Sequence, residues 1–433
     1  MTLFSIPTSR PGRALAATLV LAGLLPARAR SAGPSPADRA IAAAEQKLAG
    51  NRPDAYVELA TAFMRKSRES ADPSYYARAA AALDRALALD SDDYDALRTR
   101  AWVLLGQHDF RAALAAAERA RGLRPEDWWN YGTLADACVE LGDYERAEVA
   151  AQRMLDLRPG LPAYTRAAFL RTVFGDRPGA IELLARAARA GSPRDPESLA
   201  WTLVYLGHEY FATGKLAAAA AAYTRALAVL PDHYLALGSL ARVRAAEGRL
   251  DEAAALYRQA VARVPSPDLV SALGDVHAAA GQADEAEHEY ALVDYMGQVA
   301  EATGTTYGRQ LALFYADHDR RLPDALRLAE QEATMRGDIY TDDALAWALY
   351  KNGRPAPAAR AAHRALRLGT EDALLEYHAG LIAAAAHHPR RAARHLRRAL
   401  GLNPYFDLRQ APIARARLAA LDAPARIVLG GKE

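Results

Sequence analysis

The chain has 433 residues, of which 51% are apolar and only 8% aromatic, with one cysteine and a formal net charge of +2. A lone cysteine excludes an intramolecular disulfide and a thiolate zinc or iron–sulfur site, and so small a net charge is not typical of nucleic-acid-binding proteins. A chain of this length exceeds a single compact core, so it must divide into domains or grow by repetition. Because strand-like alternation is missing and Ala and Leu dominate, an all-α protein is predicted.

Residues 1–29 have the organisation of a secretory signal peptide. Arg10 and Arg13 precede an apolar run from Ala14 to Leu25, and small residues flank Arg28 in a cleavage pattern that ends at Ala29. We therefore predict an exported protein, periplasmic or extracellular, that is cleaved near Ala29. The apolar run is shorter than the roughly 20 residues that span a bilayer. An uncleaved segment that tethers the protein to a membrane stays open as an alternative.

Residues 30–52 are rich in Pro, Gly, Ser and Ala, and we interpret them as a flexible spacer. One short helix is predicted within it, from Asp38 to Leu48. Ser35 and Asp38 are the candidate caps of this helix.

Beyond Pro53 the sequence repeats itself at an offset of 34 residues, which links Ala219 to Ala253 and Pro231 to Pro265. Each unit contains two helical patterns on either side of a glycine turn. Each unit then ends at or near a proline, which cannot continue the helix. The units are therefore predicted to be helical hairpins.

The unit from Leu199 to Asp232 resembles the tetratricopeptide repeat family. The resemblance is carried by Leu203, Leu206, Gly207, Tyr210, Gly214, Ala219, Tyr223, Ala226 and Pro231. Leu216 departs from it, because the family has an aromatic residue there. The resemblance implies an all-α, right-handed α-solenoid, a superhelix of about ten tandem helix-turn-helix repeats. In such proteins the first helix of each hairpin lines an inner groove that contacts a protein or peptide.

The repeats divide the chain into blocks. Residues 53–291 are assigned to an N-terminal block and residues 307–405 to a C-terminal block. Residues 292–306 are expected to be an irregular connection, an extended second helix with a loop. Residues 406–433 are predicted to form a capping helix and a tail, because a solenoid must cover its last apolar face.

No catalytic motif accompanies the repeats. The sequence lacks a phosphate-binding glycine loop, a Gly-x-Ser-x-Gly elbow and a His-Glu-x-x-His helix. We therefore expect no enzymatic activity, no cofactor and no nucleic-acid partner. His387, His388 and His395 are the tightest histidine group but a weak ligand set, so a periplasmic metal-handling or small-ligand protein is kept only as an alternative. The basic run from Arg390 to Arg398 is interpreted as the solvated face of a helix.

The predicted function is that of an exported scaffold that binds a protein or peptide in its concave groove, with a role in envelope assembly or export. As the resemblance implies, the candidate contacts lie on the exposed stripe of the first helices, where aromatic residues outnumber charges. The candidates are Trp129, Asp136, Trp201, His208, Phe211, Arg242, Asp275, Tyr340, Trp347, Tyr350, Lys351 and Tyr377. For Trp201 and Trp347, packing between hairpins is an equally good interpretation.

Overall fold

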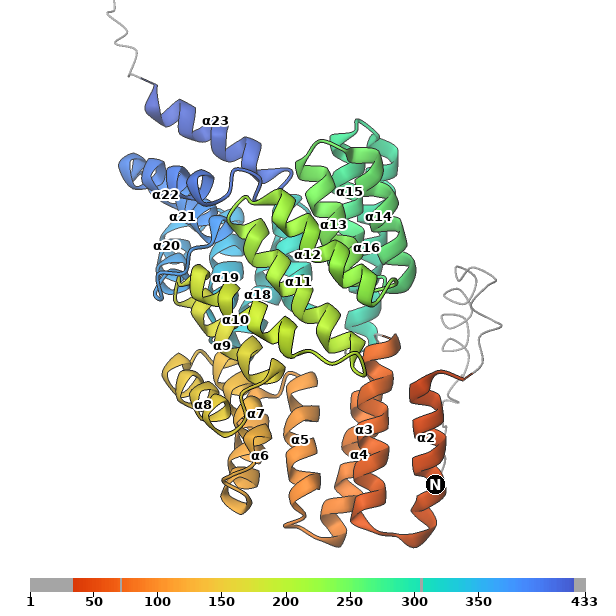
Figure 1. Cartoon of the computed structure of the whole chain (residues 1–433). Coiled ribbons are helices and arrows are strands. Elements are labelled where there is room, and N and C mark those ends of the chain that lie inside the picture. Colours follow the sequence, from red (N-terminus) through yellow and green to blue (C-terminus); the bar gives the residue numbers. More distant parts are fainter. Residues whose placement is uncertain (1–33, 71, 304–306, 424–433) are drawn as a thin grey trace, which may run out of the picture.

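The computed structural model describes residues 34–70, 72–303 and 307–423, so the predicted signal peptide and the last ten residues lie outside it. The described part contains 22 α-helices and no strand (Figure 1). Twenty of the helices form ten hairpins, which confirms the predicted solenoid of about ten repeats. The hairpins are α3 (Pro53–Ser70) with α4 (Ser74–Leu89), α5 (Tyr94–Gly106) with α6 (Phe110–Leu123), α7 (Trp128–Glu140) with α8 (Tyr144–Leu157), α9 (Leu161–Val173) with α10 (Arg177–Ala190), α11 (Pro196–Ala212) with α12 (Leu216–Val229), α13 (Tyr234–Ala246) with α14 (Leu250–Arg263), α15 (Pro267–Ala279) with α16 (Ala283–Thr303), α17 (Gly308–Asp317) with α18 (Leu322–Met335), α19 (Ile339–Lys351) with α20 (Pro355–Ala365), and α21 (Ala373–Ala385) with α22 (Pro389–Leu402).

Small residues let the two helices of each hairpin approach closely. Ala219 and Ala253, which the repeat offset relates, are both fully buried. At Gly207 a Cβ atom would clash with the Tyr223 ring of the facing helix, so a glycine is required there. The small residues in the repeat pattern therefore mark the positions where the two helices of each hairpin touch.

The segment predicted as a flexible spacer is instead part of the packed structure. Helix α2 (Pro36–Lys47) begins at a capping box in which Ser35 and Asp38 bond each other's backbone. Ala44 is buried with the core of α3 and α4, and Lys66 of α3 forms an ion pair with Asp38 at 2.7 Å. The predicted short helix and its caps are therefore present, and only the expected flexibility of residues 36–47 is wrong, because the helix docks on the first hairpin.

Residues 292–303 are not irregular, because α16 continues through them to Thr303. The expected extended second helix is therefore present. Val293 and Ala300 are buried along this extension, and Met296 packs against the core that includes α17. Continuous apolar spacing, with no proline, keeps the helix intact.

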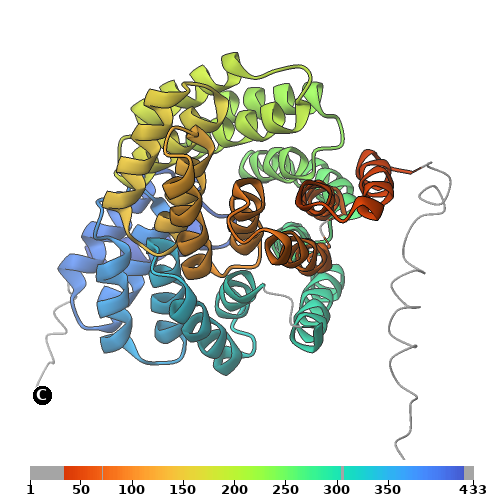
Figure 2. The same cartoon turned by 90° about the horizontal axis from the view of Figure 1, so that it is seen from below.

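The superhelix winds far enough for late repeats to contact early ones. From below, the repeats follow one another around a ring (Figure 2). Gly337 N donates to Glu140 O at 2.8 Å, and Asn403 Nδ2 donates to Phe211 O at 2.9 Å across 192 residues. These bonds join the C-terminal ends of α7 and α11 to the segments that follow α18 and α22, so late repeats are fixed to early ones along this edge.

Candidate functional site

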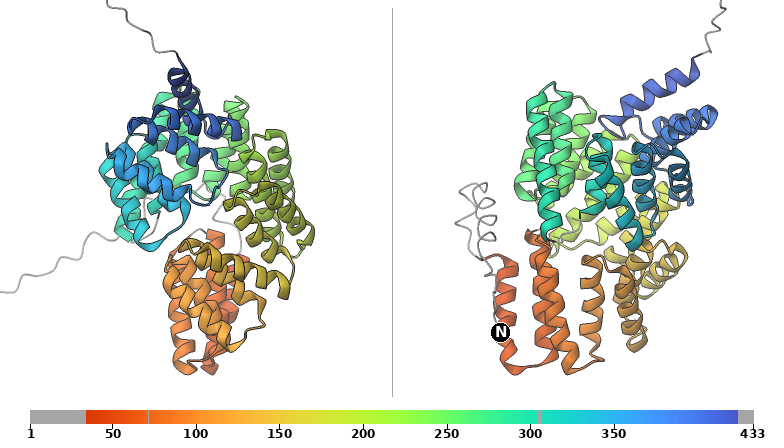
Figure 3. Two further views of the ribbon diagram at one scale, coloured as in Figure 1. Left: turned by 90° about the vertical axis from the view of Figure 1, so that its left-hand side faces the viewer. Right: turned by 180° about the vertical axis from the view of Figure 1, so that it is seen from behind.

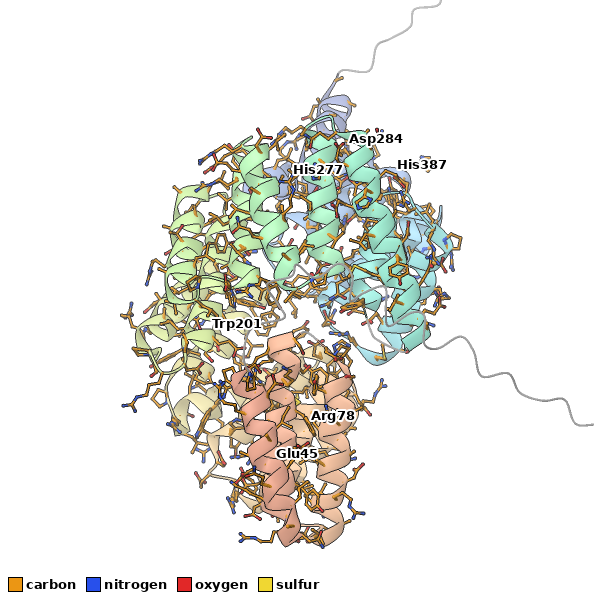
Figure 4. The ribbon with its side chains drawn as sticks, turned by 90° about the vertical axis from the view of Figure 1, so that its right-hand side faces the viewer. Glu45, Arg78, Trp201, His277, Asp284 and His387 are labelled. Atoms are coloured by element: carbon orange, nitrogen blue, oxygen red, sulfur yellow. The ribbon has the colours of Figure 1, made fainter. Side chains whose placement is uncertain are left out.

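The hairpins from α3 to α12 make up the first half of the superhelix. Their inner surface forms a groove of about 810 Å³, which we call the open groove. It runs along the first helices α5, α7, α9 and α11 and reaches the end of α3. Its aromatic lining consists of Trp102, Trp129, Phe169, Trp201 and Tyr205. Figure 4 labels Trp201 at the level where the N-terminal helices meet the later repeats.

The aromatic rings stand in two groups. The Trp102 and Trp129 rings pack edge to face with centroids 6.1 Å apart, while Trp201 lies 3.8 Å from Tyr205. Trp201 is 37% exposed, a large fraction for so apolar a side chain. Exposed rings held by neighbouring rings can anchor an apolar side chain at little entropic cost.

The polar groups of the open groove are held in fixed positions. Arg166 makes a two-pronged contact with Asp136, with N···O distances of 2.9 and 2.6 Å. Arg68, at the end of α3, lies 5.3 Å from the Trp102 ring centroid and 3.3 Å from Glu197 of α11. This contact links the first hairpin to the fifth and limits the groove at that end.

A buried ion pair supports the wall of the open groove. Arg177 donates to Glu209 at 2.7 Å, and their side chains are only 5% and 9% exposed. The Thr172 hydroxyl donates to the other Glu209 oxygen at 2.7 Å. Arg177 Nε also donates to Glu371 O at 2.8 Å, so the same side chain connects two turns of the superhelix.

The inner surface of the second half, along α13 to α21, is crossed by the chain itself. Residues 403–410, which we call the crossing segment, run from α22 to α23 (Gln410–Asp422). Phe406 is buried, with its ring 5.4 Å from that of Tyr377, and its carbonyl accepts a hydrogen bond from Arg242. The crossing segment thus occupies the place where a solenoid would hold a peptide.

Charged groups fix the far end of the crossing segment. Arg409 contacts Asp275 at 3.3 Å, and Gln410 donates to Asp317 at 2.6 Å. Trp347 Nε1 donates to the same Asp317 oxygen at 2.7 Å. First helices α11, α13, α15, α17 and α21 therefore contact this segment, and α19 contributes Trp347, which holds Asp317 in place.

Asp317 belongs to an enclosed polar cluster. Burial raises the pKa of Asp317 to about 6. His378 is fully buried and 2.9 Å from Asp343; burial lowers the pKa of His378, but Asp343 and Asp317 outweigh it, and the pKa is raised overall. Trp347 stacks on His378 at 4.1 Å, so the cluster is shielded from solvent.

The structure divides the predicted contact residues into three groups. Trp129, Asp136 and Trp201 line the open groove. Those that hold or surround the crossing segment are Phe211, Arg242, Asp275, Trp347 and Tyr377. Those that pack locally are His208 on Ser239, Tyr340 against the core of α7 and α8, Tyr350 on Trp347, and Lys351 with Asp319.

Phe211, Trp347 and Tyr377 are 4%, 2% and 1% exposed, because neighbouring helices or the crossing segment cover them. The prediction that Phe211 and Tyr377 are available to a partner is therefore wrong, and of the two interpretations of Trp347 the structure shows packing between hairpins. Groove residues that the prediction missed are Trp102, Phe169 and Tyr205. Trp102 could have been found from the repeat offset, because it precedes the predicted groove residue Asp136 by 34 residues.

The predicted histidine group does not converge. His387 and His388 lie in the turn before α22, whereas His395 Nδ1 lies 2.6 Å from Glu376 of α21. Within residues 34–70, 72–303 and 307–423, no three His, Cys, Asp or Glu side chains are grouped to hold a metal ion.

In the same ranges, no helix has the length and hydropathy needed to cross a membrane. Cys138 is 1% exposed, and burial raises the pKa of its thiol to about 11.

The fold and the groove define a helical-repeat protein of the solenoid class. Models of the tetratricopeptide repeat family match residues 104–170, 204–266 and 240–295. The chain is a tetratricopeptide-repeat protein. No curated protein matches its sequence.

Solved structures with a similar arrangement share little sequence with this chain. The human IFIT1 dimer with PPP-AAAA is 15% identical, with a TM-score of 0.45, over 80% of this chain and 82% of that one. PilW, a widely conserved type IV pilus biogenesis factor, is 19% identical, with a TM-score of 0.40, over 50% and 96%. A tetratricopeptide repeat protein from Parabacteroides merdae is 18% identical, with a TM-score of 0.35, over 60% and 98%.

Proposed function

We propose that this protein is an exported, non-enzymatic scaffold that binds an extended segment of a partner protein in its open groove. The observation that carries the proposal is the contrast between the two halves of the inner surface. The second half is crossed by residues 403–410, whereas no segment crosses the first half, which leaves Trp201 37% exposed in a groove of about 810 Å³. A groove of this size suits several side chains of an extended peptide.

The crossing segment indicates the kind of contact that the inner surface makes. Arg242 binds a main-chain carbonyl, and an aromatic side chain inserts beside Tyr377. The open groove offers the aromatic part of this chemistry in its tryptophans, whereas its Arg166 is already bonded to Asp136. The expected ligand is therefore an extended peptide with one or more large apolar side chains.

We also propose that the protein is exported and takes part in envelope assembly. They are supported by the arginines, apolar run and small-residue pattern of residues 1–29. The native mature protein is then expected to begin near Arg30. Mass spectrometry of the protein recovered from its host tests this, and a mature protein that retains Met1 would contradict it.

Replacing both Trp129 and Trp201 with alanine is expected to weaken peptide binding at least roughly tenfold, because buried aromatic anchors dominate such interfaces. The probe is a set of peptides enriched on the wild-type protein from a random display library. Binding is measured by titration, with labelled peptide, of wild-type and variant protein.

The matched control is Trp128→Ala. Trp128 is the neighbouring residue on α7, but it lies outside the open groove, 5.1 Å from the Arg158 guanidinium. This variant should bind the peptides as the wild type does, with unchanged helicity. If the double variant also binds unchanged, or if no peptide is enriched, the groove is not a peptide site.

A further inference from the structure

Opposite charges are concentrated in two separate parts of the chain. Residues 352–423 contain 12 arginines, no lysine and five acidic residues. Residues 264–308 contain eight acidic residues and neither lysine nor arginine. This asymmetry is hidden in the overall charge of +2, and it gives the molecule a strongly basic and a strongly acidic region.

The basic region has its centre on α22. We call Arg390, Arg391, Arg394, Arg397 and Arg398 the arginine face; the helix carries no acidic residue. Arg397 pairs with Asp422 and Arg398 with Glu376, whereas Arg390, Arg391 and Arg394 are exposed and have no ion-pair partner among the described residues.

The positions of Arg390 and Arg391 are unfavourable in the isolated chain. They occupy the first turn of α22, where the helix dipole favours acidic side chains, and no side chain caps this end. The repulsion among these unpaired charges would be relieved by a partner that brings negative charge.

The acidic region has its centre on α16. We call Asp284, Glu285 and Glu287 the acidic face, and all three are exposed. Glu287 pairs with Arg320, while Asp284 and Glu285 have no ion-pair partner in the described ranges. Tyr295, further along the same helix, is 42% exposed and adds an apolar contact.

The two faces lie on helices at opposite sides of the molecule. Helices α16 and α22 lie on opposite sides of the superhelix in the front view and from below, and the view from behind agrees (Figures 1, 2 and 3). Figure 4 places Asp284 and His387, near the starts of the two helices, at the same end of the molecule. One chain therefore cannot join its own faces, but two neighbouring chains can.

We propose that copies of this chain associate head to tail, with the arginine face of one chain on the acidic face of the next. Such a contact leaves one face free at each end, so association is open and grows with concentration. Exposed ion pairs are individually weak and screened by salt, so the association is expected to be modest and to weaken at high ionic strength. A second copy is favoured over single-stranded nucleic acid because the arginine face contains no aromatic residue for base stacking.

Sedimentation velocity of the purified protein tests this proposal, because each face can be neutralised separately. Variant one changes Arg390, Arg391 and Arg394 to alanine; variant two changes Asp284, Glu285 and Glu287 to alanine. At low ionic strength the wild type should form oligomers whose size grows with concentration. Each variant alone should associate roughly 3- to 100-fold more weakly and sediment as a monomer at concentrations where the wild type is oligomeric. An equimolar mixture of the two variants should form dimers and nothing larger, since one complementary pair of faces remains.

The matched control changes Arg121, Arg146 and Arg153 to alanine, which alters the net charge as variant one does but lies on α6 and α8. This control should still oligomerise, and circular dichroism should show wild-type helicity for every variant. A wild type that stays monomeric at low ionic strength would overturn the proposal. So would a mixture of the two variants that stays monomeric, or a monomeric wild type whose arginine face binds duplex DNA or vesicles of anionic phospholipid instead.

Discussion

Replacing Arg177 with alanine is expected to lower the free energy of unfolding by about 3–5 kcal/mol, because it leaves a buried carboxylate without a partner. Glu209 is 9% exposed on its side chain and would keep only the Thr172 hydroxyl as a hydrogen-bond donor. The change also removes the bond to Glu371 O that ties two turns together. Urea unfolding followed by circular dichroism measures the loss.

The control for Arg177→Ala is the double variant Arg177→Leu with Glu209→Leu, which removes both charges and keeps the site filled. Replacing a buried ion pair with apolar residues is often close to neutral, so the double variant should be clearly more stable than Arg177→Ala. An Arg177→Ala protein with wild-type stability would show that water reaches Glu209 and that the wall of the open groove is not dry.

Replacing Gly142 with alanine is expected to separate two turns of the superhelix. Gly142 has φ +76°, and a Cβ atom there would clash with Gly337 O, next to the bond from Gly337 N to Glu140 O. Strain at positive φ costs about 1 kcal/mol, and forcing packed groups apart adds about 1–3 kcal/mol. The radius of gyration in solution, measured by small-angle scattering, should increase.

Gly248 provides a matched control for Gly142. It occupies the same turn of another hairpin with φ +78°, but nothing lies within 4 Å of a Cβ atom there. Gly248→Ala should therefore carry the backbone strain alone and leave the radius of gyration unchanged. Equal effects of the two substitutions would mean that the contact between turns contributes no stability.

The local features of the fold could be predicted from the sequence because they repeat. The offset between Ala219 and Ala253 and the close approach at Gly207 depend only on neighbouring helices. The same logic located Trp129 and Trp201 on the inner surface. Short-range packing rules apply to each hairpin independently, so ten hairpins could be recognised one by one.

The features that escaped prediction are long-range. The contact between Gly142 and Gly337 depends on small rotations that accumulate over several repeats, and no local pattern encodes their sum. The crossing segment is likewise invisible in the repeat pattern, because Phe406 lies after the last hairpin. Its position decides which inner residues are free, which is why Tyr377 was wrongly expected to be available.

The inner surface has one open half and one half that the crossing segment occupies. Hydrogen–deuterium exchange of the wild-type protein, with and without a peptide enriched from the display library, tests it most directly. Exchange in α5, α7, α9 and α11 should be slower when the peptide is bound, and exchange in α13 to α21 should not change. Protection of α13 to α21, or release of residues 403–410 when the peptide binds, would contradict it.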